Sequence, residues 1–338
     1  MRCCTMLLLT LAAVSGPALA AGQDRPAEPV AKIERLDPRF DQLVPKDSAV
    51  EKLADGFTWA EGPVWDQPGG CLLFSDVPKN TVMKWQPSEG LSKFLTPSGY
   101  TGAEPRGGEG GSNGLALDAT GRLILCQHGD RCIARRETDG RFTTLADRCQ
   151  GKRFNSPNDL VFRSNGDLYF TDPPYGLPKR AADPTRETDF SGVYRLSADG
   201  QVTLLTKEMT YPNGIGFSPD EKTLYVSQSD SKRPLWMAYP VKADGTLGPG
   251  RVFCDPSGWP KTLAAGAPDG LKVDKAGNLF ATGRGGVNVF APDGTLLGRV
   301  SPGVVTANCC FGEDGSVLYL TSQKYLFRIK TGTKGLGF

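Results

Sequence analysis

Histidine is almost absent from this chain, which has a single one, His128, in 338 residues. The 9 cysteines follow no Cys-x-x-Cys spacing, so the residues argue against a zinc site built from thiolates and imidazoles. An excess of one charge is also missing, because 39 Lys and Arg residues oppose 37 Asp and Glu residues and leave a net charge of +2. Without a basic run or an aromatic-basic stripe, the sequence does not indicate nucleic-acid binding.

A long hydrophobic run is lacking as well. The most apolar segment, residues 1–20, has a short basic start, an apolar stretch broken by Gly16 and Pro17, and an Ala-x-Ala end. It is too short for a membrane span and is typical of a secretory signal, with cleavage predicted after Ala20. We therefore expect an exported protein, periplasmic if the source is a Gram-negative bacterium, in which residues 21–47 form a linker or partly ordered arm.

Removal of that leader takes Cys3 and Cys4 with it and leaves an odd set of cysteines. In an oxidising compartment, at least one of them must then stay free or pair between chains. Cys126 and Cys132 flank the short hairpin "CQHGDRC", and a three-residue loop would place them opposite each other at a separation that allows a disulfide. The remaining members of the set are Cys71, Cys149, Cys254, Cys309 and Cys310.

Glycine and proline, in contrast, are frequent, with 42 and 26 residues, as expected for short strands joined by tight turns. One unit recurs along the chain: an apolar strand, a glycine or polar turn, and two further apolar strands. Its openings are "EGPVWD" at Glu61, "NGLALD" at Asn113, "NDLVF" at Asn158, "NGIGF" at Asn213, "DGLKVD" at Asp269 and "NCCFG" at Asn308.

Six such units of four antiparallel strands predict an all-β fold, a six-bladed β-propeller over residues 48–338. A β-sandwich with coincidental turns is the alternative, but a repeat period of ~40–50 residues favours blades. The last unit shows only three clear strands before the chain ends. The segment "SAVEKLADGF", Ser48 to Phe57, is expected to supply its outer strand and close the ring.

The first residue of each unit carries a side-chain oxygen, and the innermost strands of a propeller line its central channel. We therefore expect these six oxygens to converge on one mouth of the channel. Asn and Asp also favour turns at strand entry, but that role does not explain Glu61. Carboxylate and amide oxygens without His or Cys are ligands of a hard cation. The charges of Glu61 and Asp269 would balance a divalent ion, of which Ca²⁺ fits best, with Mg²⁺, Mn²⁺ and Zn²⁺ as alternatives.

At these residues the chain resembles the SMP-30/gluconolactonase/regucalcin family of six-bladed propellers. The motifs "AEGPVW", "RFNSPNDLVF", "YPNGIGF", "APDGLKVD" and "TANCCFG" occur in the family's order and spacing, and "QHGDR" and "FTDPPYGL" look like those of its bacterial gluconolactonase-type members. The resemblance implies one divalent cation bound by a Glu, two Asn and an Asp. These roles fall on Glu61, Asn158, Asn213 and Asp269, and Asp269 is also the implied catalytic base.

Asn113 and Asn308 are not standard ligands in the family, so we place them behind the ligands or on the substrate. Loops between each second and third strand should surround the same mouth. Three residues at the start of these loops, His128, Asp172 and Arg284, are predicted to orient substrate hydroxyls. His128 is also a catalytic candidate, although a lone histidine is often structural.

Two further loops are expected at the mouth. The long third-blade loop, Pro173 to about Ser191, is placed to form a wall or lid. Three other residues at the start of second-to-third-strand loops or beside them are Asp76, Ser229 and Asp230. The segment "RGGEGGSNG", Arg106 to Gly114, lacks the Lys and Ser/Thr of a phosphate-binding loop and is interpreted as a flexible loop.

These features predict a divalent-metal-dependent lactonase that opens a sugar-type lactone to its hydroxy acid, with Asp269 taking a proton from the attacking water. One alternative keeps this metal site but cleaves another ester or a phosphotriester. A second alternative is a non-catalytic propeller that binds a sugar or calcium. The expected partner is a small-molecule lactone, with no nucleic acid and no membrane span, and the oligomeric state stays open.

Overall fold

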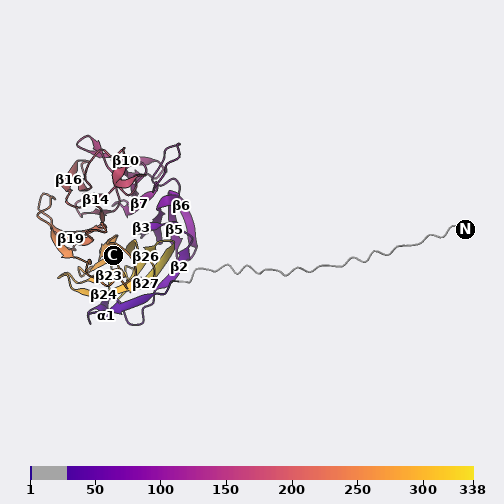
Figure 1. Cartoon of the computed structure of the whole chain (residues 1–338), viewed down its shortest axis with the longest axis vertical. Coiled ribbons are helices and arrows are strands. Elements are labelled where there is room, and N and C mark those ends of the chain that lie inside the picture. Colours follow the sequence, from indigo (N-terminus) through magenta and orange to yellow (C-terminus); the bar gives the residue numbers. More distant parts are fainter. Residues whose placement is uncertain (2–28) are drawn as a thin grey trace.

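The computed structural model describes Met1 and residues 29–338, and it forms six antiparallel blades around a central axis (Figure 1). The predicted six-bladed β-propeller is therefore confirmed. The predicted signal sequence, its cleavage point after Ala20 and the first part of the expected arm lie outside the described residues. Among the residues that are described, no helix is long and apolar enough to cross a membrane.

The first three blades follow each other along the chain. Blade one consists of β3 (Ala60–Asp66), β4 (Cys71–Asp76), β5 (Thr81–Gln86) and β6 (Gly90–Leu95), with the 3₁₀ helix η1 (Val77–Lys79). Blade two consists of β7 (Ser112–Leu117), β8 (Leu123–Gln127), β9 (Cys132–Arg136) and β10 (Phe142–Ala146), followed by the small hairpin β11 (Arg148–Cys149) and β12 (Lys152–Arg153). Blade three consists of β13 (Leu160–Phe162), β14 (Leu168–Asp172), β15 (Gly192–Leu196) and β16 (Val202–Thr206), with the 3₁₀ helix η2 (Arg180–Ala182).

The last three blades complete the ring. Blade four consists of β17 (Pro212–Phe217), β18 (Thr223–Gln228), β19 (Leu235–Pro240) and β20 (Arg251–Cys254). Blade five contains β21 (Leu271–Val273), β22 (Leu279–Gly283), β23 (Gly286–Phe290) and β24 (Leu296–Ser301). Blade six contains β25 (Asn308–Gly312), β26 (Val317–Ser322) and β27 (Tyr325–Lys330). The innermost strands β3, β7, β13, β17, β21 and β25 each contact the next, so together they line the channel.

The ring closes as the sequence predicted. Strand β2 (Glu51–Asp55) pairs antiparallel with β27, with Glu51 opposite Arg328 and Asp55 opposite Tyr325. Blade six therefore takes its outer strand from the beginning of the chain. This closure pairs the edge of β27, which would otherwise remain open to another chain.

The segment expected as a linker or partly ordered arm adds structure to the ring. Strand β1 (Lys32–Arg35) pairs with β24 as a fifth strand of blade five. The helix α1 (Phe40–Leu43) follows, and Phe40 and Val44 are fully buried in a core shared by blades five and six. The N-terminal segment thus packs against the outer side of two neighbouring blades.

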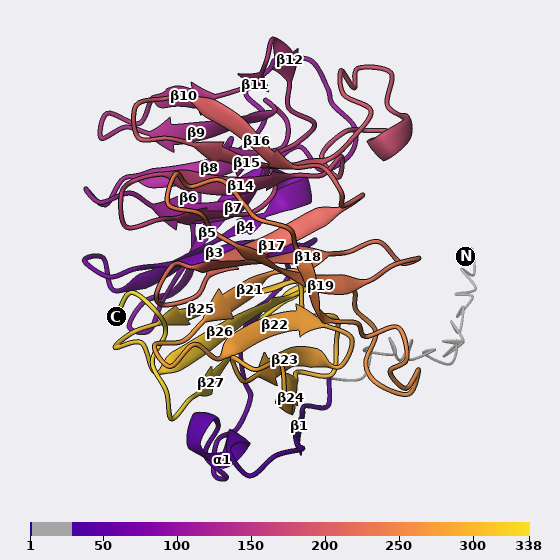
Figure 2. The same cartoon turned by 90° about the vertical axis from the view of Figure 1, so that its left-hand side faces the viewer.

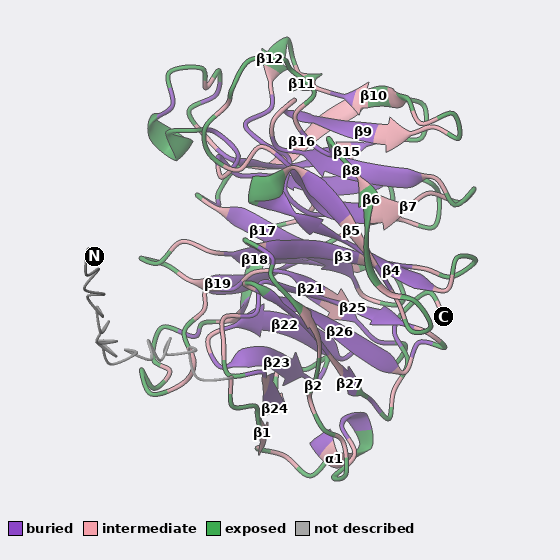
Figure 3. Ribbon diagram, turned by 90° about the vertical axis from the view of Figure 1, so that its right-hand side faces the viewer, coloured by how far each residue is buried: buried purple, intermediate pink, exposed green. Residues whose placement is uncertain are grey.

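The hydrophobic core lies between the blades. The second strand of each blade is apolar on both faces because it is covered by neighbouring sheets, and these strands are buried throughout most of their length (Figure 3). Trp65 of blade one, for example, stacks on Tyr319 of blade six with ring centroids 5.6 Å apart. In a side view, the loop that contains η2 projects from one end of the propeller, and the C-terminus lies at the opposite end (Figure 2).

The predicted disulfide between Cys126 and Cys132 is wrong. Gln127, rather than Cys126, lies opposite Cys132, and Cys126 lies opposite Ile133, so the loop is one residue longer than a three-residue hairpin. Because side chains alternate between the faces of a sheet, this register turns the two sulfur atoms to opposite faces. Cys132 Sγ instead contacts Gln127 Oε1 at 3.2 Å, and every cysteine among the described residues is a free thiol.

Candidate active site

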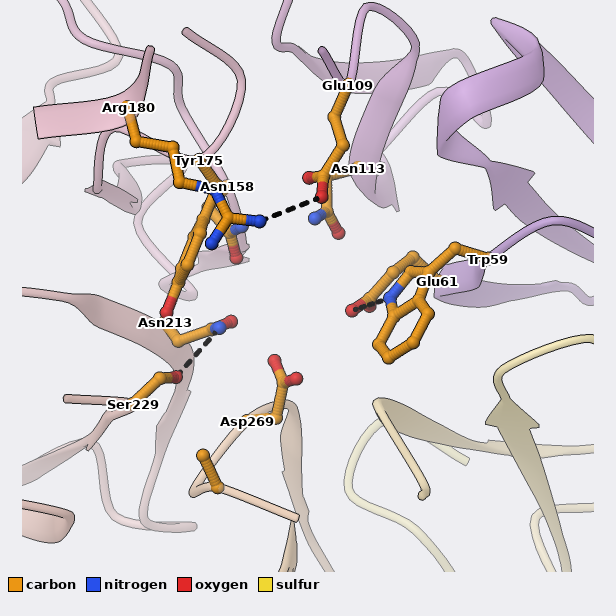
Figure 4. A pocket seen from close by; sticks show the side chains of 11 residues that line it. Trp59, Glu61, Glu109, Asn113, Asn158, Tyr175, Arg180, Asn213, Ser229 and Asp269 are labelled. Atoms are coloured by element: carbon orange, nitrogen blue, oxygen red, sulfur yellow. Dashed lines mark hydrogen bonds and ion pairs between the residues drawn. The ribbon is translucent and has the colours of Figure 1, made fainter. Parts of the chain in front are cut away.

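A cavity of about 320 Å³ opens at one end of the central channel (Figure 4). Five of the six residues that begin the repeated units line it, each from a different blade: Glu61, Asn113, Asn158, Asn213 and Asp269. The rest of its lining comes from Trp59, Glu109, Tyr175, Arg180, Ser229 and Ala267. The expectation that side-chain oxygens converge at one mouth is thus realised in five of the blades.

Local irregularities in the innermost strands direct these side chains into the cavity. The pairing register of β3 with β4 shifts between Glu61 and Val64, and β7 and β17 shift at the equivalent positions around Asn113 and Asn213. Such bulges re-aim a side chain that regular alternation would turn elsewhere. Asn158 and Asp269 precede their strands, but their N–H groups still bond to the carbonyls of the neighbouring second strands, at 2.8 and 3.1 Å.

Hydroxyl groups on the second strands tie each blade to the next at the level of the cavity. Ser75 Oγ donates to the carbonyl of Asn113 at 2.8 Å, and Thr171 Oγ1 donates to the carbonyl of Asn213 at 2.8 Å. Thr282 Oγ1 makes the corresponding bond from blade five to the carbonyl of Ala307, also at 2.8 Å. These buried bonds fix the backbone that carries the cavity side chains.

Glycine follows the cavity residue in four blades because the next blade lies too close for a side chain: its backbone at Gly62, Gly114 and Gly214, and the Asn308 side chain at Gly270. A Cβ on Gly62, which has φ of +51°, would lie 1.9 Å from the carbonyl oxygen of Asn113. A Cβ on Gly214 would lie 2.2 Å from the carbonyl oxygen of Asp269. The motif of a polar residue followed by glycine therefore reflects the close approach of inner strands around the channel.

Gly214→Ala should therefore lower the free energy of unfolding by about 1–3 kcal/mol, the usual cost of overpacking, because the backbone at Asp269 must move to make room. The measurement is urea denaturation. Gly258→Ala serves as the matched control, since no atom lies within 4 Å of its added Cβ. Equal stability of the two variants would contradict the close approach.

Burial governs the electrostatics of the two cavity carboxylates. It raises the pKa of Glu61 to about 8, although the Gly62 N–H at 3.1 Å partly offsets the effect. Burial also raises the pKa of Asp269 well above its usual value, and the charge of Glu61 raises it further. The charges of Asp159 and Glu109 also raise the pKa of both groups, so this cluster of carboxylates withdrawn from water favours a compensating positive charge nearby.

The polar atoms of the site fit a hard cation. Asp269 Oδ1 and Asn113 Oδ1 are buried without a hydrogen-bond partner. Asn213 Nδ2 donates to Ser229 Oγ at 3.0 Å, which leaves the amide oxygen directed into the cavity (Figure 4). Among the described residues no three or more His, Cys, Asp or Glu side chains cluster to hold a metal, so any ion here would rely on amide oxygens as well as two carboxylates.

Two loops form the outer wall. Arg106 Nη2 donates to the carbonyl of Gly176 at 2.6 Å, and this bond joins the glycine-rich loop to the third-blade loop. Further in, Arg180 lies 4.0 Å from Glu109 Oε1 across the cavity (Figure 4). Arg180 has a left-handed backbone with φ of +50°, and burial raises the pKa of Glu109. The predicted wall therefore not only encloses the cavity but also adds charged side chains to its lining.

The comparisons with known proteins agree with this geometry. Residues 59–324 match the family described as "SMP-30/Gluconolactonase/LRE-like region". The chain belongs to this family. It is 40% identical to a gluconolactonase from Zymomonas mobilis over 96% of this chain and 93% of that protein.

Two other members are informative. A solved gluconolactonase from Xanthomonas campestris superposes with a TM-score of 0.77 and 33% identity, covering 91% of this chain and 97% of that one. A pentonolactonase from Haloferax volcanii is 26% identical over 78% of this chain and 80% of its own length. This family member is accordingly a lactonase-type hydrolase that acts on ester bonds.

Four residues expected at the site of this family member do not line the cavity. His128 is fully buried 3.9 Å from Glu109 Oε2, and burial lowers its pKa to about 3, so the imidazole is neutral at ordinary pH. Asp172 is buried as well, and its carboxylate accepts the N–H groups of Asn155 and Ser156 at 2.7 Å each. His128 lies against Gly176 of the third-blade loop, and Asp172 holds Ser156, whose Oγ bonds to Pro173 and Gly176 of the same loop.

The other two residues are Arg284 and Asn308. The carbonyl of Arg284 accepts from Asn288 Nδ2 at 3.3 Å, and its side chain lies outside the cavity lining. Asn308 turns deeper into the channel, where its Nδ2 contacts Asp159 Oδ2 at 3.5 Å and its Oδ1 accepts from the Cys309 N–H at 2.8 Å. Asn308, the first residue of the sixth unit, therefore forms part of the channel wall behind the cavity.

The sequence interpretation missed several lining residues. Trp59 lies two positions before Glu61, and strand alternation was a usable signal because residues two apart share a face. Glu109, Tyr175 and Arg180 lie on loops without periodicity, so no pattern could place them. Of the other loop residues expected at the mouth, Ser229 lines the cavity, whereas Asp76 is buried and accepts the N–H groups of Thr58 and Trp59.

Proposed function

We propose that this protein is a divalent-metal-dependent lactonase that opens a sugar-type lactone, the substrate class that the names of its gluconolactonase and pentonolactonase relatives indicate. The observation that carries the proposal is the arrangement of buried Glu61, Asn158 and Asn213 and half-buried Asp269 around one cavity, with the buried Asp269 Oδ1 lacking any hydrogen-bond partner. The volume of about 320 Å³ falls in the range of small-molecule sites and suits a single sugar ring.

The same four residues would hold the cation. Their donor set contains only oxygen, which favours Ca²⁺, with Mg²⁺, Mn²⁺ and Zn²⁺ as the other candidates. When bound, the ion supplies Lewis-acid polarisation of the lactone carbonyl. The carboxylates of Glu61 and Asp269 would remain ionised beside it, since its charge offsets the burial that raises their pKa values.

The chain's own residues account for the remaining steps. Asp269 takes a proton as the water oxygen attacks the carbonyl carbon, and the ring C–O bond then breaks while its oxygen leaves as a hydroxyl with a returned proton. Asn113 and Arg180 line the same cavity and are placed to hydrogen-bond substrate hydroxyls. Arg180 Nη2 lies 4.0 Å from Glu109 Oε1 across this cavity.

The test is hydrolysis of a panel of aldono-lactones, with and without a chelator, and with a phosphotriester as control substrate. The proposal expects lactone hydrolysis that chelation abolishes and added Ca²⁺ restores. Chelator-insensitive hydrolysis together with no bound metal by elemental analysis would remove the metal from the proposal. If the protein cleaves the phosphotriester faster than any lactone, a phosphotriester would replace the lactone as the proposed substrate.

Export is part of the proposal and rests on the leader-type sequence of residues 1–20. Fractionation of the source cells and N-terminal sequencing of the mature protein test it. A new N-terminus at Ala21 in the exported fraction would support it, and an intact Met1 in the cytoplasmic fraction would refute it.

The stabilisation by Ca²⁺ should grow as the pH rises. The pKa of Glu61 is raised from 4.5 to about 8 on folding, so the ion-free folded state binds more protons than the unfolded state between these values and loses stability as the pH increases through them. A cation binds the ionised carboxylates and offsets that loss. The melting temperature difference between Ca²⁺-loaded and chelated protein is therefore expected to be larger near pH ~8 than near pH ~5. A constant difference would show that the cation binds elsewhere.

A further inference from the structure

A second hollow adjoins the catalytic cavity. It has a volume of about 440 Å³ and shares Tyr175, Arg180 and Ser229 with the first cavity as common lining. Its other lining residues are Tyr211, Asp230, Ser231 and Lys232. None of the four residues proposed to hold the cation lines it. This hollow can therefore bind part of a ligand but offers no centre for hydrolysis.

The chemistry of the second hollow fits a sugar ring. The rings of Tyr175 and Tyr211 pack with centroids 5.3 Å apart at an angle of 37°, and they present an aromatic wall. Aromatic faces pack against the C–H face of a sugar, while hydroxyl, carboxylate and ammonium groups bond its hydroxyls. Asp230, Ser231 and Lys232 add these polar groups to the lining of the hollow.

Tyr211 and Asp230 are held in place before any ligand binds. Tyr211 donates its N–H to Gln228 Oε1 at 2.9 Å, and Pro212 restricts the backbone directly after it. Asp230 accepts from Thr210 Oγ1 at 2.5 Å and from the Lys232 N–H at 2.9 Å. A preorganised site loses less conformational entropy on binding, which is expected of a ligand site rather than an incidental groove.

We infer that the second hollow binds a glycosyl ring joined to the lactone, so that the preferred substrates are lactones of disaccharide acids. This inference rests on the proposed lactonase function. The lactone ring would occupy the inner cavity beside Asp269, and the attached sugar would pass Ser229 to lie against Tyr211. The shared residues Tyr175 and Arg180 would contact both rings.

The experiment compares kcat/KM for glucono-δ-lactone with kcat/KM for the δ-lactones of cellobionic, lactobionic and maltobionic acids, using the full-length protein supplied with Ca²⁺. At least one disaccharide lactone should be preferred by about tenfold, the value of a good aromatic contact. Tyr211→Ala should bring this preference close to one, and Tyr211→Phe should retain most of it. Lys232→Ala should also reduce it, whereas Lys93→Ala, which changes an exposed lysine on β6 away from this hollow, should not.

Competition by the open acids measures binding without turnover. Cellobionate or lactobionate should inhibit more strongly than gluconate, and Tyr211→Ala should remove that difference. Hydrolysis of glucono-δ-lactone without any disaccharide preference would overturn this inference and leave the proposed function intact. Failure to hydrolyse any lactone would overturn both.

Discussion

Asp269→Asn is expected to lower kcat by about 10²- to 10⁴-fold even when the cation site is saturated, the usual contribution of a positioned general base. Asp269 lies at the entrance of β21, and its Oδ1 has no partner among the described residues. The substitution retains the size of the side chain and one oxygen, so substrate KM should change little. The measurement is lactone hydrolysis across a metal titration, with metal occupancy followed separately.

A full recovery of kcat once the cation site is filled would show that Asp269 only holds the ion. The base would then have to be another group on the same cavity. Glu109 is the first candidate, because it lines the cavity and burial raises its pKa toward the working range. His128 is a weaker one, since its imidazole is fully buried and does not line the cavity.

Glu61→Gln should fail in a different way. Its carboxylate accepts the Gly62 N–H at 3.1 Å and the Trp59 Nε1–H at 3.4 Å, so these neighbours hold it in place. The substitution removes one of the two carboxylates of the ring but not the assigned base. Metal affinity should fall by at least about 100-fold, since even residues behind a ligand contribute 10- to 100-fold. Excess Ca²⁺ should then restore most of kcat.

The two variants serve as controls for each other because each removes one negative charge from the same cavity. Calorimetric titration with Ca²⁺ gives the affinity directly, and a rate assay at saturation gives kcat. If Glu61→Gln stays as slow as Asp269→Asn at full occupancy, Glu61 takes part in the reaction itself. If neither substitution changes Ca²⁺ affinity, the cation is not bound by this ring.

The sequence predicted the fold because the propeller is a repeated local pattern. Each unit carries its own turns and apolar strands, and even the closing strand β2 could be assigned from the incomplete last unit. The converging oxygens followed from the same repetition. Five of the six lie at the cavity, because strand geometry and a recurrent bulge turn the first residue of these units toward the channel mouth.

The failures have a common physical cause in the loops. His128 and Asp172 begin loops at the correct end of the propeller, but the third-blade loop folds over them, and a Cβ on Gly176 would lie 2.5 Å from His128 Cβ. Loop position therefore located the correct face without showing which side chains reach the cavity. Arg180 reaches it through a left-handed backbone that no propensity favours for arginine. The hairpin at Cys126 failed for a similar reason, since one extra loop residue reverses the faces.

The closing pair of strands also determines when the molecule can finish folding. Arg328 on β27 bonds to Glu51 on β2 at 2.9 Å across a separation of 277 positions. During synthesis β2 emerges long before its partner exists, and contacts of such separation form slowly. Until the last strand arrives, the growing chain has an unpaired sheet edge on each side of an open ring. A chain that stops before Tyr325 keeps those edges unpaired. A truncation of the final residues therefore leaves the whole propeller ring open, rather than damaging a single blade.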